Sequence, residues 1–302
     1  FVVLCRPRRP PGSTRVRSAA GSDVYKGQDQ FRINDGPFDD NRESMSDLAI
    51  YQYLLIALIF VWSGFVRSGL GFGGAVLSLP FLLLVLDQPL VFLPIIAVHL
   101  LVFSSLTIWM NNRTGAGKQR EAGSGTVDWQ YLWRILAIMI VPKLIGVFGL
   151  ITMPSDILSA IIFVIVALYS VSYIINRPFR SGSKTVDAIF LMVGGYISGT
   201  SLIGAPLIIA VAAQHLPKEK LRDTLFALWF ILVLIKMAAF VWAGIDLQLI
   251  HHLWLLPCAA VGHVIGLYAH DRILQAETPV FFRLLGTVLL LVSSVGIVSV
   301  LW

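Results

Sequence analysis

A succession of long apolar segments dominates this chain, and most of them match the thickness of a lipid bilayer. A helix that spans a membrane needs about 20 mostly apolar residues. Hydrophobic residues make up 57% of the sequence and charged residues only 13%, whereas a soluble domain has about 25% charged residues. A soluble fold could not bury so much apolar surface. The sequence therefore predicts an all-α, polytopic integral membrane protein.

Ten apolar elements follow residue 44. The sixth and seventh are short and are interrupted by Gly, Ser and Pro, which is typical of helices broken within the membrane. If the short elements pair into hairpins, the count falls from ten transmembrane helices to eight. The ten elements cover residues 48–66, 70–86, 90–110, 129–151, 157–175, 186–198, 203–216, 224–243, 249–269 and 280–302.

The connections between these elements alternate in charge, and this alternation predicts their orientation. Lys and Arg collect in cytoplasmic loops, so we expect the odd-numbered connections to face the cytoplasm and both ends of the bundle to face outward, in a bacterial inner membrane. The formal charge of +6 therefore reflects orientation, and we expect no nucleic-acid partner. The odd connections contain Arg67; Arg113, Lys118 and Arg120; Arg177, Arg180 and Lys184; Lys218, Lys220 and Arg222; and Arg272. The even connections contain Asp87, Asp156 and Asp246, with neither Lys nor Arg.

Residues 1–44 differ from the rest of the chain because they are polar, charged and without a sustained apolar run. A secretory signal needs a continuous apolar core of about 7–15 residues, which this segment lacks. Residues 17–28 resemble translated adapter read-through. We expect residues 1–44 to be a disordered, non-native tail and the native protein to begin at Met45.

The two halves of the remaining chain are related in sequence. Aligning Gly64 with Gly195 also aligns Gly73 with Gly204. Each half contains five elements, an odd number, so the second half enters the membrane from the opposite side. Inverted repeats of this kind are common in secondary transporters, where they rock about a central site. We expect the repeats to cover residues 45–176 and 177–302.

Each repeat carries a glycine-rich break followed by a proline. The first is Gly71-Phe-Gly-Gly-Ala-Val-Leu-Ser-Leu-Pro80, and the second is Gly195-Tyr-Ile-Ser-Gly-Thr-Ser-Leu-Ile-Gly-Ala-Pro206. This pair resembles the signature of the sulfite exporter TauE/SafE family of membrane permeases, over about residues 50–302. The resemblance implies a permease for sulfite, a sulfonate such as sulfoacetate, or a related anion. The second break departs from the Gly-x-Gly-Gly-Pro that is usual in the family.

The backbone at these breaks is a candidate substrate site. A helix that restarts within the membrane exposes N–H groups at its first turn, and these attract anions. The alternative is that the glycines allow close helix packing, as in the pairs Gly69 and Gly73, Gly195 and Gly199, and Gly262 and Gly266. The candidate binding residues are Gly71, Gly73, Gly74, Ser201, Gly204 and Ala205.

Several titratable side chains lie within the apolar elements. Lys143 and Lys236 lie at least six residues from the ends of theirs, where a charge costs about 3 to more than 10 kcal/mol. An anionic substrate would neutralise them; the alternatives are snorkelling or bonding to carbonyls. His99 and His263 are candidates for proton coupling, or for interhelical hydrogen bonds. We assign Arg67 to membrane orientation, with anion recruitment as the alternative.

Together these features predict a secondary permease that exports or exchanges a small anion, such as sulfite or an organosulfonate, by alternating access between the repeats. A passive anion channel and a non-transporting membrane scaffold are the alternatives. After residue 45 every Asp and Glu lies in a connection or at an element end, so we expect no enzymatic activity, no metal and no cofactor. The expected partners are the small anion, the lipid bilayer and, in a homo-oligomer, further copies of the chain.

Overall fold

The computed structural model describes residues 45, 48–70, 73–114, 126–176, 179, 182–275 and 279–302. The chain divides into two units, 1–48 and 49–302, and the fold described below is that of residues 49–302. The expected tail, residues 1–44, lies outside the described residues. The described part of the second unit contains ten helices, and seven of these are long and apolar enough to cross a membrane. The prediction of an all-α, multi-pass membrane protein is confirmed.

The helices follow the predicted apolar segments closely. The largest difference is in the second element, predicted over residues 70–86, because residues 74–78 form turns and the helix that follows them covers only Leu79–Val85. The helices are α1 (Ile50–Leu70), α2 (Leu79–Val85), α3 (Pro89–Thr114), α4 (Trp129–Thr152), α5 (Ser155–Ile174), α6 (Lys184–Ser201), α7 (Ala205–His215), α8 (Lys218–Trp242), α9 (Leu249–Gln275) and α10 (Pro279–Leu301).

Helices α1 and α2 form a hairpin, here called the first hairpin. At its open end, the Gln52 side chain near the start of α1 donates a hydrogen bond to the carbonyl oxygen of Val85, the last residue of α2, over 3.2 Å. At its closed end, Ser63 Oγ donates to the Gly74 carbonyl oxygen over 3.3 Å. The start of α1 and the end of α2 therefore lie on the same side of the bundle.

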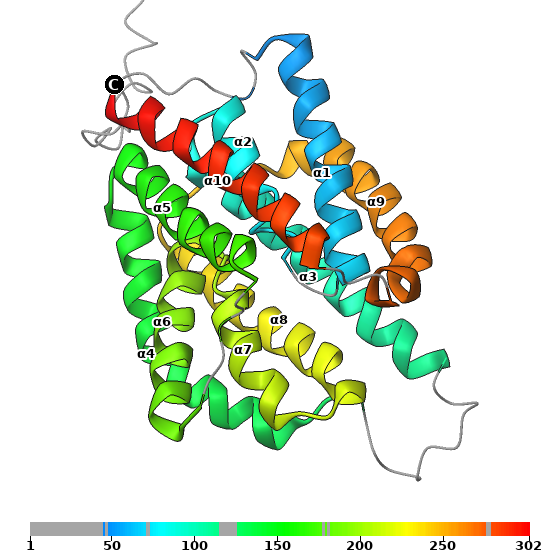
Figure 1. The fold of residues 1–302 in the computed structure, drawn as a ribbon. Helices are drawn as coiled ribbons and strands as arrows, with labels where there is room; N and C mark the ends of the chain where they lie inside the picture. Colours follow the sequence, from blue (N-terminus) through cyan, green and yellow to red (C-terminus); the bar gives the residue numbers. More distant parts are fainter. Residues whose placement is uncertain are drawn as a thin grey trace, which may run out of the picture. The chain divides into compact units, whose positions relative to one another are not determined.

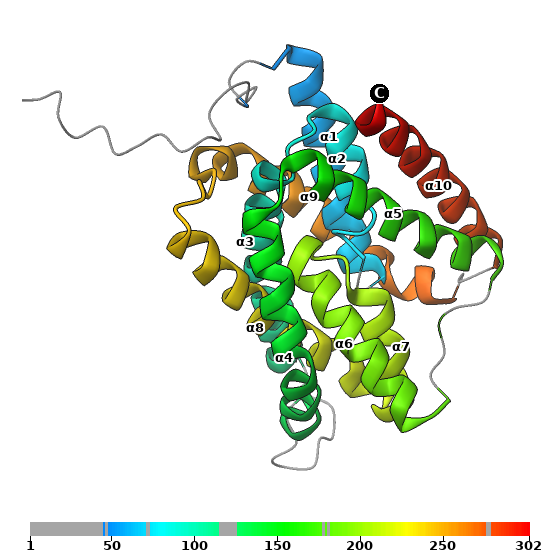
Figure 2. The same cartoon turned by 90° about the vertical axis from the view of Figure 1, so that its left-hand side faces the viewer.

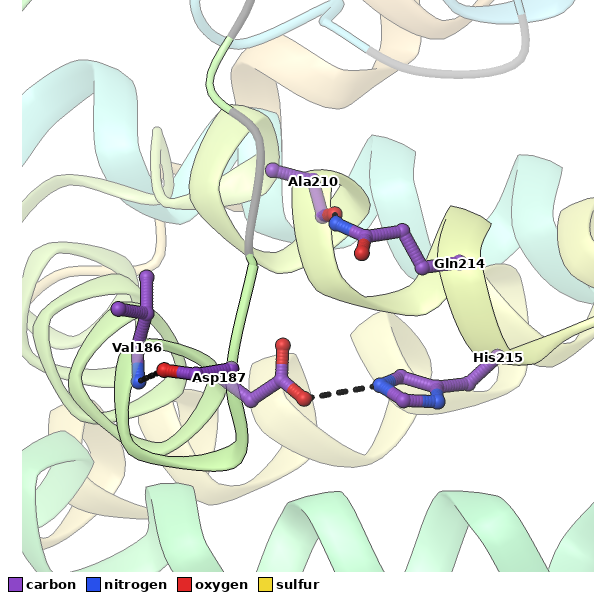
Figure 3. A network of polar contacts seen from close by, with 6 residues as sticks. Val186, Asp187, Ala210, Gln214 and His215 are labelled. Atoms are coloured by element: carbon purple, nitrogen blue, oxygen red, sulfur yellow. Dashed lines mark hydrogen bonds and ion pairs between the residues drawn. The ribbon is translucent and has the colours of Figure 1, made fainter.

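Helices α6 and α7 form the second hairpin. Asp187 in the first turn of α6 pairs with His215 in the last turn of α7, with 2.9 Å between the carboxylate oxygen and Nε2 (Figure 3). At the closed end, Leu202 has a left-handed backbone conformation with φ of 62°. A Cβ atom at Gly204 would collide with the Gly194 carbonyl oxygen, so the turn can close only with glycine at this position.

The two hairpins occupy opposite ends of the unit formed by residues 49–302. Figures 1 and 2 both show α1 and α2 toward the top and α6 and α7 toward the bottom. The first hairpin packs on α9, and the second packs on α4. Two further pairs, α3 with α8 and α5 with α10, make the other large helix contacts.

Glycines let the hairpins approach their neighbours closely. A Cβ atom at Gly262 in α9 would collide with the Val61 carbonyl oxygen of α1, and one at Gly146 in α4 would collide with the Tyr196 carbonyl oxygen of α6. A Cβ at Gly195 would lie 2.9 Å from the Met139 carbonyl oxygen. These contacts support close packing as the role of such glycines.

The hairpin arrangement corrects the placement of Arg67. We expected this residue in a connection that faces the cytoplasm. It lies instead in the last turn of α1 and is only 7% exposed. The physical reason is that the glycine-rich segment after α1 is the closed end of a hairpin packed against other helices, and not a loop at the surface of the bundle.

Candidate functional site

The closed ends of the two hairpins meet at one cavity, here called the central cavity. Its volume is about 40 Å³, counted as the space that the centre of a water-sized sphere can occupy. Its wall is formed by both hairpin turns together with α1, α3 and α8. The residues that line it are Phe60, Ser63, Arg67, Gly73, Gly74, Ala75, Val76, Ile96, His99, Leu100, Ser104, Leu202, Ala205, Phe226 and Trp229.

The cavity contains members of both glycine-rich motifs that the sequence pointed to. Gly73 and Gly74 from the first motif and Ala205 from the second line it, although more than 130 residues separate them. Ser201 and Gly204 stand next to this wall but are not among the lining residues. The Ser201 hydroxyl donates to the Ile197 carbonyl oxygen within α6, over 3.0 Å. Gly71 lies outside the described residues.

The first turn favours glycine at two positions for different reasons. Gly73 has a φ of 84°, a left-handed conformation that costs other residues about 1–2 kcal/mol. At Gly74 the backbone itself is unstrained, but a Cβ atom would lie 3.1 Å from Arg67 Cβ and from the Ser63 carbonyl oxygen. Gly74 thus leaves room for the arginine beside the cavity.

Arg67 is the cation of the central cavity. One terminal nitrogen, Nη1, donates to the His99 carbonyl oxygen over 2.9 Å, and the guanidinium carbon lies 4.9 Å from the centre of the Phe103 ring. Its Nε atom is buried and has no hydrogen-bond partner in the described part of the chain. The hydrogen bond and the ring fix the guanidinium at the wall and leave part of its donor edge unused.

Further polar groups of the cavity are buried without partners. His99 is 1% exposed, and neither of its ring nitrogens has a hydrogen-bond partner among the described residues; the same holds for the Ser104 hydroxyl. Buried polar groups are nearly always paired with protein, water or ligand. None of the described residues that line the cavity is Asp or Glu. An arginine, a hydroxyl and an imidazole without a carboxylate suit a small anion.

Lys143 and Lys236 do not line the central cavity, although both are fully buried as their sequence position predicts. Lys143 Nζ donates to the carbonyl and hydroxyl oxygens of Ser198, over 2.9 and 3.1 Å. Ser198 lies in the last turn of α6, where the helix dipole favours a positive charge. Lys236 Nζ has no hydrogen-bond partner among the described residues.

The two intramembrane histidines flank one aromatic ring. The ring centre of Phe103 lies 6.3 Å from that of His99 and 4.8 Å from that of His263. His99 lines the cavity, whereas His263 Nδ1 shares a hydrogen bond with the Ser68 hydroxyl and so connects α9 to α1. The structure therefore brings only one of the two histidines to the cavity wall.

Sequence reasoning gave too little weight to Arg67 and did not identify the pairing of Arg67 with His99. The available signal was the position of the arginine, one turn before the first glycine break and three residues after Gly64. Within the described residues there is no group of three or more His, Cys, Asp or Glu side chains that could hold a metal ion.

Comparison with known proteins agrees with this architecture. The sequence profile of the sulfite exporter TauE/SafE family matches residues 55–296, which include every lining residue of the cavity, the whole second hairpin and the first hairpin from residue 55 onward. Comparison with curated proteins and with solved structures gives no significant match. The family consists of membrane transporters and not of enzymes. The profile spans most of this multi-pass helical chain, and the chain therefore belongs to the sulfite exporter TauE/SafE family.

Proposed function

We propose that this protein is a secondary permease that exports or exchanges a small oxyanion, such as sulfite or an organosulfonate, across a bacterial inner membrane. The observation that carries the proposal is the central cavity, in which a buried arginine meets the closed ends of both hairpins and the described lining residues include no carboxylate. A buried cation without a carboxylate partner favours an anion as its ligand.

Arg67 suits an oxyanion better than a halide. The guanidinium is planar and offers parallel N–H groups that match two oxygens of one anion. The hydrogen bond from Nη1 to the His99 carbonyl oxygen uses one of these groups and sets the plane of the fork. The Ser104 hydroxyl and the start of α7 at Ala205 add further partial positive charge at the same wall.

The helix contacts support the proposed inverted repeats, residues 45–176 and 177–302. In the alignment of the two halves, α1 corresponds to α6 and α4 to α9. The large contacts α1 with α9 and α6 with α4 are then equivalent, and the pairs α3 with α8 and α5 with α10 each join corresponding helices. This pattern is the one expected for two repeats related by a twofold axis.

The proposed mechanism is alternating access, with one hairpin opening toward each side. The first hairpin closes the cavity from the side where α1 begins, and the second closes it from the opposite side. The anion bound at Arg67 would contact both hairpin turns, so its binding would shift the equilibrium between the open and closed positions of each hairpin. His99 lines the same cavity, and neither of its ring nitrogens has a hydrogen-bond partner among the described residues, which supports it as the residue that couples transport to protons.

A flux assay tests this proposal. Purified protein in liposomes is expected to move labelled sulfite or sulfoacetate, to saturate, and to accelerate when unlabelled anion is present on the opposite side. Counterflow of this kind distinguishes a carrier from a passive channel. Arg67→Met is expected to abolish flux, whereas Arg134→Met, which removes an exposed arginine of α4, leaves it unchanged.

Two results would contradict the proposal. Folded protein that moves none of the tested anions would favour a non-transporting scaffold. Flux that is unaffected by Arg67→Met would place the substrate pathway elsewhere. Size-exclusion chromatography of each variant before reconstitution separates a loss of transport from a loss of folding.

A further inference from the structure

We propose that Lys143 and Lys236 form a second binding site for a small anion, behind the turn of the second hairpin and distinct from the central cavity. This inference rests on the proposed anion transport. It adds a second binding site for the transported anion, on the side of the second hairpin.

The two lysines come from helices that pack directly on each other, α4 and α8. Both side chains are 0% exposed, so neither ammonium group snorkels to an interface. Met139 and Leu232, which lie one turn before Lys143 and Lys236 on their helices, belong to one buried hydrophobic cluster. In the part of the chain that the structure describes, neither lysine forms an ion pair with Asp or Glu.

Lys143 is tied to the second hairpin. Its Nζ atom donates to both oxygens of Ser198, and the Ser198 carbonyl oxygen also accepts the backbone N–H of Leu202 over 3.3 Å. Leu202 is the residue whose left-handed conformation turns the chain toward α7. The ammonium group of Lys143 therefore lies at the closed end of this hairpin, with one N–H group left to donate.

Lys236 is the unpartnered member of the pair. Its Nζ atom makes no hydrogen bond to any described residue, and the ring of the buried Phe240 is centred 6.0 Å away. An ammonium group carries three strong donors and is stable in an apolar interior only when these are used. With respect to the residues that the structure describes, all three donors of Lys236 are available to a ligand.

One anion would neutralise the two buried charges and accept the unused hydrogen bonds of the lysines. Placed between the ammonium groups, it would accept hydrogen bonds from each. Lys236 lies seven residues after Trp229, a cavity residue, and therefore on the same face of α8, roughly 10 Å further along the helix. The second site is thus adjacent to the cavity and separated from it by about two turns.

Crystallography with heavy anions tests this inference. Crystals of the full chain soaked in selenite, an isostere of sulfite, or in bromide, a substitute for chloride, give anomalous peaks at bound anions. We expect a peak between Lys143 and Lys236, and its loss in Lys236→Met but not in Lys184→Met, an exposed lysine of α6. A selenite peak would identify the transported class of anion, and a peak with bromide alone would identify a resident halide.

The outcomes separate this inference from the proposed function. Selenite at Arg67 without any peak at the lysine pair, in either soak of the unmodified protein, would overturn the second site and leave the permease proposal intact. A peak at the pair that persists in Lys236→Met would equally overturn it. Absence of selenite from the central cavity, together with absence of flux, would count against the proposed function instead. Should Lys236→Met fail to fold, Lys236→Gln keeps a neutral side chain of similar length for the same comparison.

Discussion

Asp187 and His215 join the two arms of the second hairpin, with 2.9 Å between the carboxylate oxygen of one and Nε2 of the other (Figure 3). The same position in the first hairpin is held by a neutral contact, the hydrogen bond from Gln52 to the Val85 carbonyl oxygen. Both hairpins are therefore tied at their open ends, one by charge and one without it. Removing a charge by mutation is therefore expected to loosen the open end of the second hairpin and not that of the first.

Replacing Asp187 with Asn is expected to loosen α7. A partly exposed ion pair contributes about 0.2–1 kcal/mol, so amide exchange in α7 is predicted to accelerate by up to about fivefold while α2 stays unchanged. Hydrogen–deuterium exchange with mass spectrometry measures both helices in one sample. Gln214→Ala is the matched control, because this neighbouring side chain donates a hydrogen bond within α7, to the Ala210 carbonyl oxygen (Figure 3). Equal exchange in Asp187→Asn and the control would refute a role of the pair in closing the hairpin.

The conservative change Arg67→Lys is predicted to impair transport although it keeps the charge. Lysine presents a single ammonium group and cannot both reach the His99 carbonyl oxygen and offer parallel N–H groups to an oxyanion. Loss of such a charged contact weakens binding by about 10- to 100-fold. The apparent KM for sulfite in liposomes is expected to rise by this factor. Arg134→Lys, on an exposed position of α4, controls for the substitution itself, and an unchanged KM in Arg67→Lys would rule out bidentate recognition.

The number and order of the helices were predictable from the sequence, because hydropathy alone selects segments that can enter a bilayer. The depth of Lys143 and Lys236 was predictable for the same reason, and both are fully buried. The sequence did not predict that these two lysines lie outside the central cavity. Which face of a helix meets which neighbour depends on contacts between segments far apart in sequence, and no single apolar run encodes that rotation.

The burial of Arg67 shows the same limit. A charge next to glycines at the end of an apolar run is the pattern of a surface connection as well as that of a hairpin turn inside the bundle. The contacts that decide between them, such as Gln52 with Val85, join residues more than 30 positions apart. The glycines were ambiguous for a related reason: Gly73 and Gly74 line the cavity, whereas Gly195 and Gly262 serve helix packing.

Gly262→Ala is expected to destabilise the contact between α9 and the first hairpin. The added Cβ atom would collide with the Val61 carbonyl oxygen and approach the Phe65 amide nitrogen, and backbone atoms cannot move aside as a flexible side chain can. Overpacking of this kind costs about 1–3 kcal/mol. The melting temperature in detergent is predicted to fall by several degrees. Gly182→Ala is the control, since a Cβ there has no neighbour within 4 Å, and equal melting temperatures would show that α1 and α9 separate without cost.

Asp87 gives the protein a pH-dependent stability that can be isolated by mutation. This residue lies in the connection between α2 and α3. Burial raises the pKa of its carboxyl group above the usual value, and nearby Asp156 raises that pKa further, while a hydrogen bond from the Ser159 hydroxyl acts in the opposite direction. A carboxyl group with a raised pKa in the folded state binds its proton more tightly when folded. Its contribution to stability is therefore most favourable at low pH and is lost as the pH rises from the unfolded value of about 3.9 through the folded one.

Asp87→Asn removes this titration and keeps a side chain of the same size. The melting temperature of the unmodified protein, relative to that of Asp87→Asn, is predicted to decrease between pH 4 and pH 7, because only the carboxyl group becomes charged in its partly buried site. Asp246→Asn, in the exposed connection between α8 and α9, controls for the loss of one negative charge. Thermal unfolding in detergent at closely spaced pH values gives the difference curve. A curve that rises with pH would mean that the Ser159 hydrogen bond outweighs burial, and a flat curve would mean that the two effects cancel.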